Sequence, residues 1–146
     1  MDDSTRREIE WECQKLSIAY ARYTDYKEYD KFVQLFAPDG ELTLGGRPII
    51  GHEKLTQSFE KRPDSLRSRH VLTNIHTHVI DESHAEGISY LTLYRHTGEN
   101  IEGDDSGPRE ISGPWAVGHY GDKFVKTEEG WRFASRILHF AFVVKN

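Results

Sequence analysis

The stretch RHVLTNIHTHV, residues 69–79, sets the expected fold. Side chains alternate between the two faces of a β-strand, and every odd position from 71 to 79 holds a β-branched residue. The even positions carry His70, His76 and His78. The pattern predicts a long strand with a β-branched face and a histidine-bearing face that borders water or a polar-lined cavity.

The alternation continues toward the C-terminus over residues 85–96, 110–126 and 131–144. Three connections join these strands. Two are the short polar turns DESH and TEEG, and the third is the polar loop NIEGDDSGP, residues 100–108. Long strands joined mainly by short turns predict an antiparallel meander.

The residues before this meander have helical periodicity. Thr5 and Glu8 match a capping box at the start of a helix over residues 5–25. The apolar residues of that helix recur at spacings of three and four; they are Ile9, Cys13, Leu16, Tyr20 and Tyr23. Shorter helices are expected over residues 29–36 and 52–62, the first ended by the turn residues Pro38-Asp39-Gly40.

Between the shorter helices, residues 41–46 predict a short strand and GRPIIG predicts a loop. Helices followed by an antiparallel sheet indicate an α+β class. The expected fold is a single domain over residues 1–146, a cone-shaped α+β barrel. Three N-terminal helices would pack in a strongly curved mixed or antiparallel sheet that encloses a pocket.

Composition excludes several classes of function. The net charge of -5 and the absence of a basic stripe make nucleic acid an unexpected partner. The N-terminus is too charged for a signal peptide, and no apolar run is long enough for a membrane span. The single cysteine, Cys13, excludes an internal disulfide and fits a reducing compartment. A cytoplasmic protein is expected.

His76, His78 and Glu82 could together form half of a cupin metal motif, because both imidazoles share a strand face. The preceding glycine and the second half-motif of cupins are missing from the sequence. The alternative, histidines on a wet sheet face near a hairpin, is favoured. We therefore expect no metal and no cofactor.

Three segments carry a family resemblance: YARYTDYKEYDKFVQLFAPDGEL, RHVLTN and GHYGDKFVKTEEGWRFASRIL. They resemble the SnoaL-like branch of the nuclear transport factor 2-like superfamily. This branch includes scytalone dehydratase, hexachlorocyclohexane dehydrochlorinase and bile-acid dehydratase. The fold hosts dehydratases, isomerases, cyclases and non-catalytic subunits, so the resemblance indicates the fold more specifically than the reaction.

The resemblance implies an acid–base pair of Asp25 and His70, in which the carboxylate orients the imidazole and the imidazole removes a proton from carbon. Tyr20 stands where the dehydrochlorinase has a lysine, so it would bind a carbonyl or hydroxyl rather than a halide. Arg136 matches an arginine of the dehydrochlorinase and would bind an anionic group or an enolate oxygen; the alternative is a surface or interface arginine.

Further positions complete the expected site. Asn74 shares the face of His70 and is expected to bind substrate. The aromatic residues expected to shape the cavity, with simple core packing as the alternative, are Tyr90, Trp115, Tyr120 and Phe140. Arg95 falls where scytalone dehydratase has its second catalytic histidine, which leaves the second acid–base group unassigned.

The leading interpretation is a cofactor-independent lyase, a dehydratase of a small cyclic or aromatic hydroxy-carbonyl compound. One alternative is a ketosteroid-isomerase-like isomerase or a polyketide cyclase. Another is a non-catalytic small subunit of an aromatic-ring-hydroxylating dioxygenase, or a ligand-binding protein. The resemblance implies a homodimer or homotrimer, because relatives associate through the outer face of the sheet. The β-branched face of residues 71–79 suits burial against a second copy.

Overall fold

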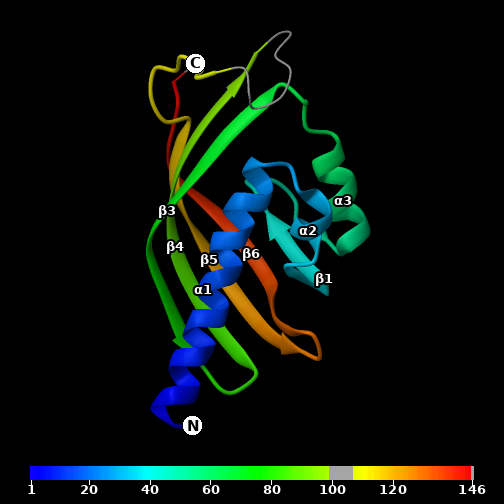
Figure 1. The fold of residues 1–146 in the computed structure, drawn as a ribbon, viewed down its shortest axis with the longest axis vertical. Coiled ribbons are helices and arrows are strands. Elements are labelled where there is room, and N and C mark those ends of the chain that lie inside the picture. The colour runs from blue at the N-terminus through cyan, green and yellow to red at the C-terminus, as the bar shows by residue number, and fades with distance from the viewer. Residues whose placement is uncertain (99–106, 146) are drawn as a thin grey trace.

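The computed structural model describes residues 1–98 and 107–145. Helices and strands follow one another as the sequence predicts, helices first and long strands last (Figure 1). The elements are α1 (Asp3–Asp25), α2 (Tyr29–Val33), β1 (Phe36–Thr43), β2 (Ile49–Ile50), α3 (His52–Glu60), β3 (Leu66–Val79), β4 (His84–Thr97), β5 (Ala116–Thr127) and β6 (Gly130–Val143).

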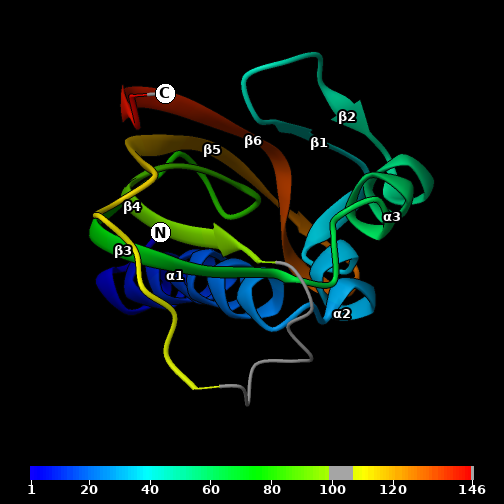
Figure 2. The ribbon, with the colours of Figure 1, turned by 90° about the horizontal axis from the view of Figure 1, so that it is seen from above.

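The described strands form one sheet in the order β2-β1-β6-β5-β4-β3. The long strands β3 to β6 are antiparallel neighbours, so the predicted meander is confirmed. β1 runs parallel to β6, which makes the sheet mixed. The sheet is curved, with α1 against the β3 side and α2 and α3 near β1 (Figure 2). The α+β fold is confirmed, but the sheet is not closed, because β2 and β3 end it within the described residues.

Helix α1 carries much of the core. Its N-cap is Asp2, whose carboxylate accepts from the backbone N–H of Thr5 at 2.7 Å. Thr5 is therefore inside the helix, and the capping box predicted at Thr5 is wrong. The predicted apolar stripe is buried along most of its length, at Ile9, Cys13, Leu16 and Tyr20. Each large apolar side chain buried in this way contributes about 1.5–3 kcal/mol.

The segment after α2 differs from the prediction. Residues 38–40 do not end a helix; they lie inside β1, where the pairing with β6 shifts between Phe36 and Glu41. Gly40 permits this irregularity, because a Cβ at that position would lie 2.9 Å from the carbonyl oxygen of Phe133. The predicted GRPIIG loop contains β2, which pairs antiparallel with β1.

Strand β3 changes face at a β-bulge around Asn74. Its pairing with β4 shifts between Thr73 and His76, and Asn74 has a backbone φ of 50°, a left-handed conformation that asparagine adopts more readily than most residues. The extra residue places His70 on the inner face, while His76 and His78 are exposed. The prediction that one face carries all three histidines is therefore wrong.

Two further segments complete the comparison with the sequence. β5 begins at Ala116, six residues later than predicted, because residues 107–115 form no strand. The predicted polar loop over residues 100–108 lies mostly outside the described residues. None of the helices within residues 1–98 and 107–145 has both the length and the apolar character needed to cross a membrane.

Candidate active site

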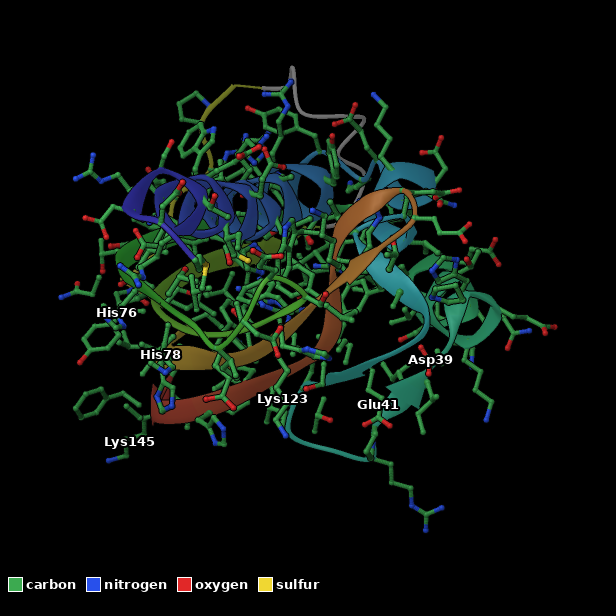
Figure 3. The ribbon with its side chains drawn as sticks, turned by 90° about the horizontal axis from the view of Figure 1, so that it is seen from below. Asp39, Glu41, His76, His78, Lys123 and Lys145 are labelled. Carbon is green, nitrogen blue, oxygen red and sulfur yellow. The ribbon has the colours of Figure 1, made fainter. Side chains whose placement is uncertain are left out.

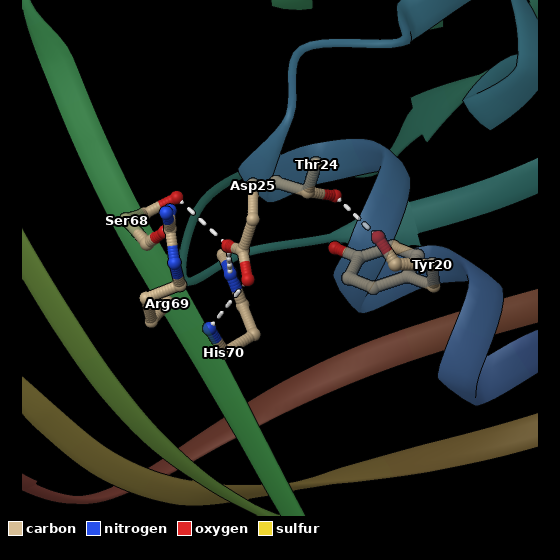
Figure 4. A network of polar contacts seen from close by, with 6 residues as sticks. All are labelled: Tyr20, Thr24, Asp25, Ser68, Arg69 and His70. Atoms are coloured by element: carbon tan, nitrogen blue, oxygen red, sulfur yellow. Dashed lines mark hydrogen bonds and ion pairs between the residues drawn. The ribbon is translucent and has the colours of Figure 1, made fainter. Parts of the chain in front are cut away.

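Asp25 and His70 meet at the junction between α1 and β3 (Figure 4). The carboxylate oxygen Oδ1 of Asp25 lies 2.5 Å from the ring nitrogen Nδ1 of His70. Its other oxygen, Oδ2, accepts the backbone N–H of His70 at 2.9 Å. The hydroxyl of Ser68 donates to Oδ1 at 2.9 Å. Three contacts from one strand therefore fix the carboxylate at the end of the helix.

This geometry assigns different roles to the two ring nitrogens of His70. An ionised carboxylate can only accept hydrogen bonds, so Nδ1 carries the proton in the contact with Asp25. Nε2 is then the nitrogen with a lone pair. The side chains are largely buried, with 8% of His70 and 7% of Asp25 exposed, and His70 lines a cavity. The arrangement suits a general base whose reactive atom meets a bound molecule.

The cavity beside His70 has a volume of about 290 Å³, at the lower end of the range for small-molecule sites. Its wall is contributed by α1, α3 and the long strands, and much of it is apolar. The aromatic residues in this wall are Tyr20, Phe59, Trp115, Tyr120 and Phe140. A wall with so many rings suits a compact ligand that contains a ring.

Tyr20 and Tyr120 form the inner end of this wall. Both side chains are almost fully buried, and their ring centroids are 5.4 Å apart. The Tyr20 ring also lies edge-on to His70, at 6.4 Å between centroids. Burial raises the pKa of both phenols above their ordinary value. Both hydroxyls therefore stay protonated near neutral pH. One phenol of the pair donates to the other, which leaves one hydroxyl to donate to a ligand oxygen.

Arg136 lies behind the tyrosines and not at the cavity wall. It is 0% exposed and forms a two-point ion pair with Asp122: Nε donates to Oδ1 at 2.8 Å and Nη2 to Oδ2 at 3.1 Å. Nη2 also donates to the hydroxyl of Ser17 at 3.0 Å. The predicted direct contact of Arg136 with substrate is not supported, and the alternative of a surface arginine is wrong.

The guanidinium of Arg136 stacks on the aromatic wall from behind. Its central carbon lies 3.8 Å from the ring centroid of Tyr120 and 4.4 Å from that of Tyr20. Burial alone would lower the pKa of Arg136, but the charge and hydrogen bonds of Asp122 raise it above its ordinary value. The arginine therefore remains a cation, and its charge opposes the effect of burial on both phenols.

The remaining predicted substrate-binding residues divide into two groups. Trp115 and Phe140 line the cavity and contact each other edge to face, with centroids 6.5 Å apart. Asn74 lies exposed at the bulge, and Tyr90 is 51% exposed; neither lines the cavity. Asn74 is excluded because the bulge places it and His70 on different faces, so the alternation used to predict it does not hold there.

Outside the cavity, His76, His78, His84 and His139 are exposed, while His52, His96 and His119 are partly buried. Figure 3 shows His76 and His78 on the face of the sheet away from α1. His119 stacks on His139 at 4.8 Å between centroids, which confirms that it is out of phase with the buried Tyr120. Among residues 1–98 and 107–145, histidine, cysteine, aspartate and glutamate form no cluster of three that could hold a metal ion.

The sequence did not indicate Ser68, Asp122 and Arg62 as part of this region, and the family resemblance indicated Arg95 only as the position of a missing catalytic histidine. Ser68 precedes His70 by two positions on the same strand face, so alternation alone could have indicated it. Asp122 follows Tyr120 by two positions on the same strand face and lies directly opposite Arg136 in the β5–β6 pairing. Arg62 and Arg95 line the cavity; their positions depend on tertiary packing.

Comparisons with known proteins agree with this architecture. Residues 5–137 match the family model described as a SnoaL-like domain, so the chain belongs to the SnoaL-like domain family. The family resemblance inferred from the sequence is confirmed. No functionally curated protein matches the chain.

Several solved structures share the fold. A protein of Novosphingobium aromaticivorans with the provisional name scytalone dehydratase has a TM-score of 0.80 at 17% identity, covering 99% of this chain and 92% of that one. A type 2 hexachlorocyclohexane dehydrochlorinase has a TM-score of 0.80 at 14% identity, covering 98% and 92%. A nuclear transport factor 2-like protein with a cystatin-like fold, also from N. aromaticivorans, has a TM-score of 0.74 at 18% identity, covering 97% and 92%. The TM-scores establish a shared fold, and identities of 14–18% carry no conclusion about the chemistry.

Proposed function

We propose that this chain is a cofactor-independent lyase, a dehydratase of a small cyclic or aromatic hydroxy-carbonyl compound. The observation that carries the proposal is the Asp25–His70 contact at the wall of a ring-lined cavity. Family membership is consistent with it, as are the names of two structural neighbours, a dehydrochlorinase and a provisional scytalone dehydratase.

The first step is removal of a proton from the carbon next to the carbonyl group. Nε2 of His70 takes the proton, the C–H electron pair moves toward the carbonyl, and an enolate forms. The ring becomes an imidazolium, whose second N–H already points at the Asp25 carboxylate. Asp25 therefore stabilises the charge that develops on His70 without accepting its proton.

The enolate oxygen requires a donor, and Tyr20 and Tyr120 are placed to supply one. Both phenols line the cavity and remain protonated near neutral pH. A donor that is already held in place costs little reorganisation when charge develops on the oxygen. Arg136 acts as a positioning residue, because its guanidinium lies against both rings and holds a positive charge behind them.

Expulsion of water completes the reaction. The enolate re-forms the carbonyl, a carbon–carbon double bond forms, and the bond from carbon to the leaving hydroxyl breaks. The imidazolium of His70 gives its Nε2 proton to that hydroxyl, which leaves as water. One histidine therefore serves as base and then as acid, so the elimination requires no second acid–base residue and regenerates neutral His70.

The experiment is a screen of one- and two-ring β-hydroxy ketones for formation of the conjugated enone. Absorbance and mass spectrometry detect the product. His76→Ala is the matched control for His70→Ala, since both histidines lie on β3 and His76 is exposed. We expect the His70 variant to lose roughly 10²–10⁴-fold in turnover and the His76 variant to retain it. Equal turnover by wild type and His70→Ala would contradict the proposal.

The same base would also serve an isomerase, which moves the proton within the substrate and releases no water. Exchange of the carbon-bound proton in D₂O that depends on His70, without enone formation, would identify an isomerase. A ligand recovered without exchange or water loss would instead support a binding protein.

For assembly and location, we retain the prediction of a cytoplasmic homodimer or homotrimer. The outer face of the sheet exposes apolar side chains that include Val71, Ile88 and Tyr90, which would suit burial against another copy. Sedimentation velocity would distinguish two copies from three, and a monomer at micromolar concentration would contradict the prediction.

A further inference from the structure

Two arginines line the cavity beside His70. Arg62 follows α3, and Arg95 lies on β4; both side chains are half-buried at the cavity wall. Among the residues that the structure describes, no acidic side chain lines this cavity. Asp25 is set back behind His70, where it accepts hydrogen bonds from Ser68 and His70.

The position of Arg95 follows from the β3–β4 register. Arg95 pairs directly with Ser68, the residue that donates to Asp25. Directly paired residues of antiparallel strands project to the same face, so Arg95 is on the inner face beside the acid–base pair. Its guanidinium lies 4.6 Å from the ring centroid of Trp115, which also lines the cavity. Stacking against an aromatic ring leaves the N–H groups at the edge of the guanidinium available to a ligand.

Arg62 reaches the same cavity from the helical side. Its guanidinium lies 5.5 Å from the ring centroid of Phe59, another cavity residue. Its charge lowers the pKa of Tyr20 against the larger effect of burial, and lowers that of Arg95 in addition to the effect of burial. The two cations therefore act on one another and on the interior of the same cavity.

Within the described residues, the ion pairs of the structure include neither Arg62 nor Arg95. Two like charges in a partly apolar cavity repel each other and lose hydration, and an anion bound between them relieves both costs. A carboxylate fits the planar guanidinium in a two-point contact.

We propose that Arg62 and Arg95 form an anion subsite, and that the ligand of this cavity is a cyclic or aromatic carboxylate. The carboxylate binds the two arginines, the ring contacts the aromatic wall, and the rest of the molecule reaches His70. As a statement about the substrate this rests on the proposed function; as a statement about binding it does not.

The test compares two probes of the same shape, 1-naphthoate and its uncharged amide, 1-naphthamide, by isothermal titration calorimetry on the purified chain. Hydrogen bonds between charged groups predict that the wild type binds the carboxylate at least roughly tenfold more tightly than the amide. A ratio near one, or no binding of naphthoate at millimolar concentration, would overturn the subsite without any variant.

Variants locate the preference. Arg62→Gln and Arg95→Gln should each lower the ratio by at least roughly threefold, and the double variant should bring it close to one. Arg132→Gln is the matched control, because Arg132 is a half-buried arginine outside the cavity, near Glu129. It should leave the ratio unchanged. Arg95→Lys keeps the charge but loses the planar two-point contact, so it should retain only part of the preference. An unchanged ratio in a folded double variant would overturn the proposal.

His70→Ala separates this subsite from the proposed reaction. The variant should keep the preference for naphthoate, because the anion does not bind His70. A preference for naphthoate without any turnover would contradict the lyase and support the subsite. Turnover that depends on His70 but favours neutral ketones, together with a probe ratio near one, would contradict the subsite and leave the lyase standing.

Discussion

Two carboxylates in this molecule pair with nitrogen side chains beside the same tyrosine, and the two pairs differ in what they leave open. The Tyr20 ring lies 6.4 Å from the His70 ring and 4.4 Å from the guanidinium of Arg136. In the Asp25–His70 pair, His70 lines the cavity and its Nδ1 is the ring nitrogen that contacts the carboxylate. In the Asp122–Arg136 pair, the side chains are 1% and 0% exposed.

Access to the cavity distinguishes a reactive pair from a structural one. Strength of contact does not decide it, since both pairs are short and largely buried. Access does: Nε2 of His70 can meet a ligand, whereas the Arg136 guanidinium is covered by Asp122 and aromatic rings. A pair with access controls chemistry, while an enclosed pair mainly controls whether the wall in front of it holds its shape.

The largest expected effect is on the Asp25–His70 pair, the open pair, in which the histidine lines the cavity. Asp25→Asn replaces the acceptor-only carboxylate with an amide that can also donate, so the His70 tautomer is no longer fixed. Turnover should fall by roughly 10²–10⁴-fold, while the free energy of unfolding should fall by only about 1–3 kcal/mol. Steady-state kinetics and urea unfolding measure the two effects. Asp81→Asn is the matched control, because it disrupts the exposed contact of Asp81 with His84. Full turnover by Asp25→Asn would reject the distinction.

The next effect is on the Asp122–Arg136 pair, the enclosed pair. Asp122→Asn keeps the shape of the side chain but leaves Arg136 as an uncompensated buried charge. Removing one partner of a buried pair costs about 3–5 kcal/mol, so this variant should lose more unfolding free energy than Asp25→Asn. Urea unfolding of both variants provides the comparison. A smaller loss for Asp122→Asn than for Asp25→Asn would reverse the assignment of structural and reactive pairs.

The sequence predicts the open pair better than the enclosed one. The family resemblance points to Asp25 and His70, because the order of its motifs along the chain can be read from the sequence. The Asp122–Arg136 pair depends on the β5–β6 register, which shifts between Lys123 and Phe124. Nothing in the sequence alone fixes such a register.

Two other features were beyond the sequence pattern for related reasons. The bulge at Asn74 reverses which alternate residues of β3 face inward, and a single asparagine in an alternating strand does not predict a bulge. Arg95 becomes a cavity residue through its pairing with Ser68, and Arg62 through the packing of α3. Tertiary structure, not residue type, places both arginines in the cavity wall.

A moderate effect is expected at alkaline pH. The pKa values of Tyr20 and Tyr120 are raised in the folded state, so the stability from their protonated forms is complete below pH 10.0, the ordinary phenol value, and is lost as the pH rises above it. Each phenol adds up to about 1.4 kcal/mol per pH unit to this loss. Unfolding measured between pH 8 and 11 should show a shallower decline in Tyr20→Phe; an identical decline would show that this phenol is not protected.

The smallest effect is expected at the bulge. Asn74→Gly retains a residue that tolerates positive φ and removes a side chain that lies outside the cavity. Unfolding free energy should change by no more than about 0.5 kcal/mol, and turnover should stay at the wild-type level. A clear loss of turnover with unchanged stability would return Asn74 to the site.

The most direct measurement is the tautomer of His70, read from two-bond ¹H–¹⁵N correlation spectra of histidine-labelled protein near neutral pH. We expect a protonated Nδ1 with a strongly hydrogen-bonded, downfield proton and an unprotonated Nε2. We also expect loss of that downfield proton in Asp25→Asn. A neutral ring with its proton on Nε2 and a bare Nδ1 would contradict the account, because the nitrogen at the cavity could then no longer act as the base.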